Sequence, residues 1–280
     1  MRLILTVVCL LFGSLLRAEM QLYVADHETK KILKIKEDGT LLWDVPNGNG
    51  HDVQVLPNGH VLLNNGNVVQ EVNADKKVVW EVGKPLVQSA EAVQRLANGN
   101  TVIADNGRMK IIELDADKKV VWEFDVPNDN KRPHPTMRMV RRLDNGNTLI
   151  SASTEDKVLE VSPEKKIVWS YAVPFPYLAT RLKNGHTLIS SGDGYGSPQG
   201  FFVIEVDAGG KTVWKYGGNE APADQKLNWP SGHVRLANGN TLIAIARDGV
   251  IREVNPDKKI VRVIKSPAMR HPATILAFED

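Results

Sequence analysis

Short apolar stretches alternate with polar turns along the whole chain after residue 18, and two turn phrases recur at a regular distance. The first phrase is Leu-x-Asn-Gly-Asn/His followed by apolar residues, and its five copies begin at Leu56, Leu96, Leu143, Leu182 and Leu236. The second phrase is a turn rich in Asp, Gly and Lys, then an apolar pair and usually a Trp, namely Trp43, Trp80, Trp122, Trp169 and Trp214. A period of ~40–50 residues indicates a propeller or another solenoid.

Each repeat contains four apolar-rich stretches that predict short strands. In the second full copy we expect strands at 91–96, 101–104, 109–114 and 119–124, all rich in Val and Ile. Asn98-Gly99 separates the first two. Because both residues tolerate positive φ, this dipeptide predicts a type I′ hairpin turn.

Four-stranded units at this period predict a β-propeller. The chain begins with stretches that match the second, third and fourth strands of a repeat (21–25, 31–36 and 40–45) and ends with one that matches a first strand (272–278). We therefore expect an all-β, six-bladed propeller of four-stranded antiparallel blades, formed by residues 19–280 as one domain. Strands from both termini should share one composite blade and close the ring.

The first 18 residues are typical of a signal peptide. Arg2 precedes an apolar run that extends to Leu16, and Ala18 is a small residue at the expected cleavage site. The run is too short for a comfortable membrane span, and no second one follows, so we expect export to the periplasm or the medium without stable membrane insertion. Cys9 is the only cysteine and lies in this segment. Thiolate metal sites are therefore excluded from the mature chain.

The charge balance gives no reason to propose a polyanionic partner. The chain has 35 basic and 33 acidic residues, and removing Arg2 and Arg17 with the signal peptide leaves 33 of each. We expect no nucleic-acid partner, and a monomer. The seven His residues lack metal-site spacing, so we expect no metal and no cofactor.

Long connections gather on one face of the expected ring, at 127–135, 190–200 and 217–230, whereas the opposite face has only tight turns. Binding usually occurs on variable loops carried by a rigid scaffold. Counting back five residues from the aligned Leu of each first strand gives six positions at the channel mouth on this face. They are His51, Glu91, Arg138, Tyr177, Ser231 and His271.

His233 stands two positions further along its strand, and the long loops add Asp193, Tyr195 and Trp229. Mouth residues that differ while the scaffold repeats predict an asymmetric ligand, either a small molecule or a protein. The alternative is that they only hydrate the channel. The Arg that precedes the repeated Leu in four copies is expected to be structural, bonding carbonyls or carboxylates between blades.

Three copies of the second phrase resemble the repeat of PQQ-like β-propellers: 38–43, 75–80 and 210–214. The resemblance implies the fold. Relatives without enzymatic activity include periplasmic scaffold propellers that help to assemble outer-membrane proteins. The quinone dehydrogenases of this type have eight blades and dedicated cofactor and calcium residues. The present chain has neither, so a bound quinone is not expected.

The segment from Gly50 to Gly59 resembles the His-Asp and Leu-Pro-Asn-Gly segment of bacterial arylsulfotransferases, which are six-bladed periplasmic enzymes. The resemblance implies that His51, His233, His271 and Arg138 bind and transfer sulfate. The chain is shorter than the larger members of that family and lacks their N-terminal domain and cysteines.

The leading hypothesis is a binding or scaffold module, and an arylsulfotransferase-like or hydrolytic enzyme is the alternative. An enzyme should gather the three His and Arg138 around one pocket. A scaffold should keep the His apart and expose an apolar patch, to which Phe175, Tyr177, Tyr195, Phe201 and Trp229 could contribute.

Overall fold

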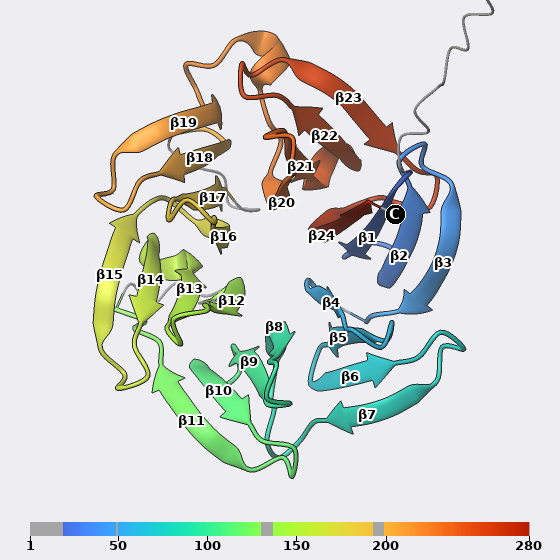
Figure 1. Ribbon diagram of the computed structural model, residues 1–280, viewed down its shortest axis with the longest axis vertical. Coiled ribbons are helices and arrows are strands. Elements are labelled where there is room, and N and C mark those ends of the chain that lie inside the picture. Colours follow the sequence, from blue (N-terminus) through green and yellow to red (C-terminus); the bar gives the residue numbers. More distant parts are fainter. Residues whose placement is uncertain (1–18, 49, 130–136, 193–198, 280) are drawn as a thin grey trace, which may run out of the picture.

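The structure is a computed structural model that describes residues 19–48, 50–129, 137–192 and 199–279. Six four-stranded antiparallel sheets stand as blades around a central axis (Figure 1). The expected six-bladed propeller is confirmed. The predicted signal peptide at 1–18 lies outside the described residues. Within them, no helix is long and apolar enough to cross a membrane.

The blades follow one another around the ring in chain order (Figure 1). Blade 1 contains β24 (Pro272–Glu279), β1 (Met20–Asp26), β2 (Lys31–Lys36) and β3 (Leu41–Pro46). Blade 2 contains β4 (Val53–Val55), β5 (Val61–Asn65), β6 (Val68–Val72) and β7 (Val78–Val82). Blade 3 contains β8 (Ala90–Arg95), β9 (Thr101–Asp105), β10 (Lys110–Leu114) and β11 (Val120–Asp125).

Blade 4 contains β12 (Met139–Arg142), β13 (Thr148–Ala152), β14 (Lys157–Val161) and β15 (Ile167–Ala172). Blade 5 contains β16 (Pro176–Arg181), β17 (Thr187–Ser191), β18 (Phe202–Val206) and β19 (Thr212–Gly217). Blade 6 contains β20 (Pro230–Arg235), β21 (Thr241–Ile245), β22 (Val250–Val254) and β23 (Ile260–Lys265). Three short 3-10 turns complete the described elements: Ser153–Glu155, Ala223–Gln225 and Ala246–Asp248.

Strands from the two ends of the chain close the ring in blade 1. The last strand, β24 in red, lies beside the blue β1 (Figure 1). Their antiparallel register runs from Met20 opposite Glu279 to Asp26 opposite Pro272, with one irregularity after Val24. This pairing covers the edge of β1, which would otherwise be open to another chain.

The Asn-Gly turns differ from the predicted type I′ geometry. The N–H of Gly59 donates to the carbonyl of Leu56, and the N–H of Leu56 donates to the carbonyl of His60, both at 2.8 Å. Gly59, and not Asn58, has the positive φ, at 79°. The loop is therefore a type I turn followed by a left-handed glycine.

The asparagine side chain explains this choice. Asn58 Oδ1 accepts the backbone N–H of His60 at 3.0 Å, a bond that holds Asn58 in the turn without positive φ. In the other four copies the side-chain oxygen of the equivalent asparagine accepts the same backbone N–H. These asparagines are Asn98, Asn145, Asn184 and Asn238.

Neighbouring blades are joined by a repeated arrangement that we call the Arg–Glu bracket. Arg142, at the end of β12, places its guanidinium 5.1 Å from the ring centroid of Trp122 in the preceding blade. The same guanidinium donates to Glu113 of that blade at 2.7 Å and to the carbonyl of its own Gly146 at 3.2 Å. The other three brackets are Arg95 with Trp80 and Glu71, Arg181 with Trp169 and Glu160, and Arg235 with Trp214 and Glu205. The expected structural role of this Arg is confirmed.

In blade 6 the arginine of the bracket comes from the fourth strand, at the position where the other bracketed blades have a tryptophan. Arg262 pairs with Glu253 along the strand ladder, where blades 2 to 5 pair Trp with Glu. From this position Arg262 bonds both Glu253 of its own blade and Glu37 of blade 1. A cation placed on β23 thus bridges the last junction, where no first-strand Arg is present.

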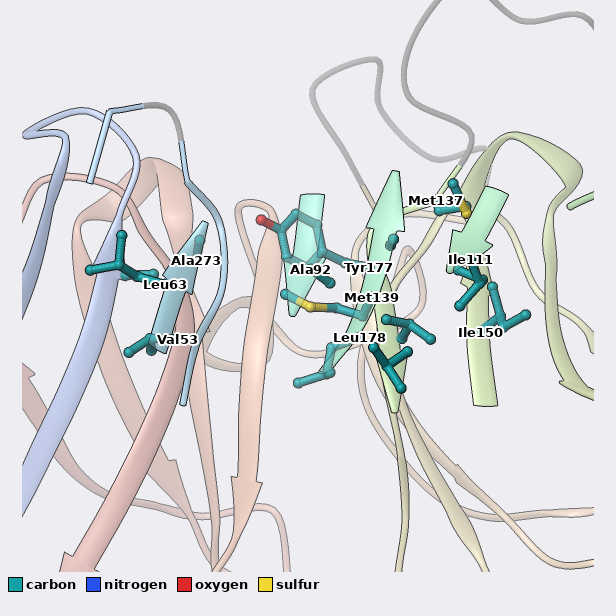
Figure 2. Packing of buried hydrophobic residues seen from close by; sticks show 14 of the residues in the cluster. Val53, Leu63, Ala92, Ile111, Met137, Met139, Ile150, Tyr177, Leu178 and Ala273 are labelled. Atoms are coloured by element: carbon teal, nitrogen blue, oxygen red, sulfur yellow. The ribbon is translucent and has the colours of Figure 1, made fainter. Parts of the chain in front are cut away.

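Side chains fill the centre of the ring below the mouth. Ala92, Met139, Tyr177, Leu178 and Ala273 belong to one buried cluster, several members of which appear in Figure 2. The hydroxyl of Thr274 lies 3.8 Å from the sulfur of Met139, so blades 1 and 4 meet across the axis. At this level the channel is packed core.

Candidate functional site

The strand register decides which residues are equivalent at the mouth. Each first strand aligns with its neighbour so that Val53, Val93, Val140, Ala179 and His233 occupy one level. Two residues earlier stand His51, Glu91, Arg138, Tyr177 and Ser231, as the spacing of the repeat predicted.

The prediction that His271 occupies the equivalent position in blade 1 is wrong. In blade 1, Ile275 opposes Val24, as Val93 opposes Ile103 in blade 3, so Ala273 takes the place of Glu91. His271 lies two residues further out. The predicted alignment failed because blade 1 has no Asn-Gly turn between its first two strands, which come from opposite ends of the chain.

Four of the predicted residues come together from four blades, and we call them the buried quartet: His51, Glu91, Arg138 and Tyr177. His51 Nδ1 lies 2.9 Å from the Tyr177 hydroxyl, and His51 Nε2 lies 3.8 Å from Glu91. Arg138 donates to Glu91 at 2.8 Å, and its guanidinium lies 5.3 Å from the centroid of the Tyr177 ring.

Burial shifts the pKa of two members of the quartet, Tyr177 and Glu91. It raises the pKa of the Tyr177 phenol above its usual range, so the phenol is neutral at physiological pH. Because the phenol keeps its proton, it can donate to His51 Nδ1 wherever that nitrogen carries none. Burial also raises the pKa of Glu91, and the nearby Arg138 cation opposes that effect.

Three half-buried rings lie beside the quartet, and we call them the aromatic rim: His27, His271 and Trp229. His27 stacks on His51 with centroids 4.3 Å apart, and it lies 5.8 Å from His271. Trp229 meets His271 edge to face at 4.9 Å. Burial, and next the proximity of His27, lower the pKa of His271. At neutral pH the rim therefore offers a neutral imidazole.

Trp229 is held in a costly state. Its φ is 66°, a left-handed conformation that is a genuine outlier for a bulky residue. The carbonyl of Trp229 accepts the N–H of Ala246 at 2.9 Å, which holds the backbone there. Its indole Nε1–H is buried, and among the described residues no acceptor bonds it. An unpaired buried donor costs about 1–3 kcal/mol.

His233 and Ser231 have other partners. His233 Nδ1 lies 2.7 Å from the Ser190 hydroxyl and Nε2 lies 3.1 Å from that of Thr180, so both ring nitrogens are occupied. Burial lowers the pKa of His233 to about 3, and the charge of Arg235 adds to the effect. The Ser231 hydroxyl donates to the carbonyl of Pro272 at 2.6 Å. These hydrogen bonds all go to residues outside the quartet.

Some of the remaining predicted residues lie outside the described ranges, and the others differ in burial. Asp193 and Tyr195 lie outside the described residues. Tyr177 is buried and contributes no exposed area to an apolar patch, whereas Trp229 and Phe201 are half-buried.

Two features escaped the sequence analysis. His27 lies between β1 and β2, and nothing in the repeat pattern brings it to the mouth. Asp52 directly follows His51 and is buried; its carboxylate receives two bonds from Arg141 of blade 4, at 2.7 and 2.8 Å. Asp52 also accepts the backbone N–H of Val93 at 2.9 Å. This network spans blades 2, 3 and 4 close to the quartet. Within the described part of the chain, no three His, Cys, Asp or Glu side chains form a group that could hold a metal ion.

No protein-family model and no curated protein matches the chain. Solved structures share its fold. A protein of unknown function from Bacteroides caccae is 18% identical with a TM-score of 0.76, over 94% of this chain and 100% of that one. Hydrazine synthase of Kuenenia stuttgartiensis is 11% identical with a TM-score of 0.63, over 93% and 92%.

A catalytically inactive His-to-Ala variant of virginiamycin B lyase from Staphylococcus aureus, solved with quinupristin, is 15% identical with a TM-score of 0.58. That match covers 78% of this chain and 70% of the lyase. At such identities these similarities establish the fold alone.

Proposed function

We propose that this protein is an exported binding module that engages its ligand at the channel mouth, on the face of the long loops. The observation that carries the proposal is Trp229, a strained residue beside His271 whose buried indole N–H bonds no acceptor within the described ranges of the chain. Strain and unpaired donors persist where function requires them. The ligand should therefore present a hydrogen-bond acceptor to the aromatic rim.

The diversity of the mouth supports recognition of an asymmetric ligand. Five equivalent positions carry five different residue types, of which Ser231 shows that a small neutral side chain suits the scaffold. The buried quartet nevertheless places Glu91, Arg138 and two titratable rings there. Burying charged groups seldom increases stability over apolar packing, so the quartet is better explained by function than by folding.

Export rests on the signal-peptide pattern of residues 1–18, and the resemblance to PQQ-like repeats supports a periplasmic or secreted module. The filled centre of the ring supports a ligand position at the mouth, since Met139 and Thr274 meet below it. A small molecule or a protein segment that ends in an acceptor group would satisfy this arrangement. No quinone is proposed.

The test compares Trp229→Phe, which removes the N–H and keeps a ring, with Lys183→Ala on the opposite face. The full-length mature protein is incubated with the low-molecular-weight fraction of envelope extract and examined by native mass spectrometry. We expect one bound mass on the wild type and on Lys183→Ala, and its loss from Trp229→Phe. Equal retention by Trp229→Phe would place the binding site elsewhere.

A second candidate is an arylsulfotransferase-like or hydrolytic enzyme, favoured by the contact of His51 with Tyr177 and Glu91 beside Arg138. In this hypothesis the proton-free nitrogen of His51, released by the Tyr177 hydroxyl, attacks sulfur, and an S–N bond forms as the S–O bond to the leaving phenolate breaks. The acceptor phenol oxygen then attacks sulfur, the S–N bond breaks, and the phenol proton passes to the phenolate released in the first step. Arg138 would stabilise the charge on the sulfuryl oxygens. His233 is not part of this hypothesis, because its ring nitrogens bond Ser190 and Thr180 and no member of the quartet.

The enzyme hypothesis is tested with p-nitrophenyl sulfate, with and without an acceptor phenol. Transfer that disappears in His51→Ala but persists in His233→Ala would support it. Release of nitrophenol without acceptor would indicate hydrolysis instead. Absence of both reactions in the folded wild type would leave the binding module.

A further inference from the structure

One blade junction lacks the Arg–Glu bracket although its tryptophan is seated normally. Trp43 of blade 1 donates its Nε1–H to the carbonyl of Ala74 in blade 2 at 3.1 Å. Trp122 and Trp214 make the same bond to the next blade, to Pro163 at 2.8 Å and to Pro256 at 3.1 Å.

The two residues that would complete a bracket around Trp43 differ in size and charge from those at the other junctions. Lys34 opposes Trp43 on the ladder, where Glu113 opposes Trp122 in blade 3. Val55 opposes Val61, where Arg95 opposes Thr101. A guanidinium has therefore been replaced by a short apolar side chain, and a carboxylate by an ammonium group.

A cavity of about 200 Å³ lies at this junction. Its lining comprises Tyr23, Lys34, Leu42 and Trp43 from blade 1, and Gly59, Val61, Asn73 and Ala74 from blade 2. A cavity of about 150 Å³ can hold benzene, so this one has room for a single substituted ring.

The charges around the cavity favour an anion. Lys34 Nζ lies 5.4 Å from the centroid of Tyr23, and within the described residues no carboxylate pairs with it. Lys76 Nζ lies 6.0 Å from the centroid of Trp43. The nearby carboxylate of Asp44 is neutralised by Lys31 at 2.6 Å and Lys76 at 2.9 Å.

We propose that the junction of blades 1 and 2 is a second binding site, which takes a small carboxylate with one aromatic ring. The ring would lie against Trp43 in the space that Arg occupies at four other junctions, and the carboxylate would pair with Lys34. The site lies at the level of the tight turns and shares no residue with the aromatic rim. It is therefore independent of the function proposed above.

The probes are benzoate and its cationic analogue benzamidinium, added to the full-length mature protein. Binding is followed by the shift of the Trp43 indole N–H in ¹H–¹⁵N spectra, assigned with Trp43→Phe. We expect benzoate to move this signal and benzamidinium to bind at least about fivefold more weakly, as the loss of one ion pair of about 1 kcal/mol implies. Equal binding of both probes, or an unmoved Trp43 signal, would overturn the proposal.

The decisive variant installs the missing bracket, Lys34→Glu with Val55→Arg. The new Arg should cover Trp43, pair with the new Glu and abolish benzoate binding. Lys34 is half-buried at the surface. The single variant Lys34→Glu should reverse the binding preference from benzoate to benzamidinium. Trp229→Phe should leave benzoate binding unchanged. Benzoate binding that survives Lys34→Glu would refute the site.

Discussion

Lysine occupies a left-handed backbone position in four of the turns that join third to fourth strands. Lys76, Lys118, Lys165 and Lys258 have φ between 62° and 66°, whereas Gly39 and Gly210 stand at the matching position in blades 1 and 5. A residue with a Cβ pays about 1–2 kcal/mol in this region, and glycine does not. The backbone conformation at this turn position is thus the same in all six blades, whereas the residue type differs between them.

We expect Lys165→Gly and Lys258→Gly to stabilise the protein by about 0.5 kcal/mol each. Relief of left-handed strain exceeds the entropy cost of glycine, which is about 0.5–1 kcal/mol. Denaturant unfolding would measure the gain. Lys166→Gly is the matched control, because Lys166 has no positive φ, and it should destabilise.

His233 should dominate the acid side of the stability curve. Its pKa is about 3 in the folded protein and about 6.5 when unfolded, so between these values the unfolded chain binds a proton that the folded chain does not. Stability contributed by neutral His233 is therefore present above pH ~6.5 and lost at about 1.4 kcal/mol per pH unit as the pH falls.

The check is the unfolding free energy of wild type and His233→Asn between pH 7 and pH 4. The variant is expected to be less stable at pH 7, and the difference should shrink steadily as the pH falls. A difference that does not change with pH would contradict the assignment.

At the scale of strands and blades, the Arg–Glu bracket repeats because the sequence phrases that supply its residues repeat, and it joins each of four pairs of neighbouring blades in the same way. Arg142 contacts Trp122 and donates to Glu113, both in the preceding blade, and Glu113 also accepts a hydrogen bond from Asn100 Nδ2 at 2.6 Å. Arg262 shows that the cation can come from the other side of the interface when the tryptophan is missing.

We expect Arg142→Gln to cost about 2–3 kcal/mol, because Glu113 is buried and would lose its charged partner. Adding Glu113→Gln to that variant should cost less than the same change in the wild type. A double-mutant cycle on unfolding free energies measures this coupling. Additive effects of the two substitutions would show that the ion pair does not hold the blades together.

At the scale of the whole molecule, the pairing of β24 with β1 closes the ring. Met20 and Glu279 lie opposite each other, so the two ends of the described chain meet in one sheet. No other blade depends on both ends of the chain.

Removal of residues 272–280 should open the ring, leave β1 as an exposed edge and cost a large part of the 5–15 kcal/mol typical of a folded domain. Thermal unfolding and size-exclusion chromatography would show a lower melting temperature and association. Phe278→Ala is the control, since this side chain is 41% exposed and should matter little. An unchanged melting temperature after truncation would contradict the role of closure.

The sequence by itself determined the blade count, the composite blade and the face that carries long loops. These follow from turns, strand lengths and periodicity, which depend on residues close together in the chain. It also identified four members of the mouth cluster, because the Asn-Gly turn sets the register of blades 2 to 5.

Only the tertiary structure decided which side chains meet. It gave His233 partners outside the quartet, moved His271 outward, brought in His27 and revealed the empty bracket at Trp43. Each outcome depends on contacts between blades or between the chain ends. No local pattern encodes such contacts, since they arise from the way that separately specified sheets pack around a common axis.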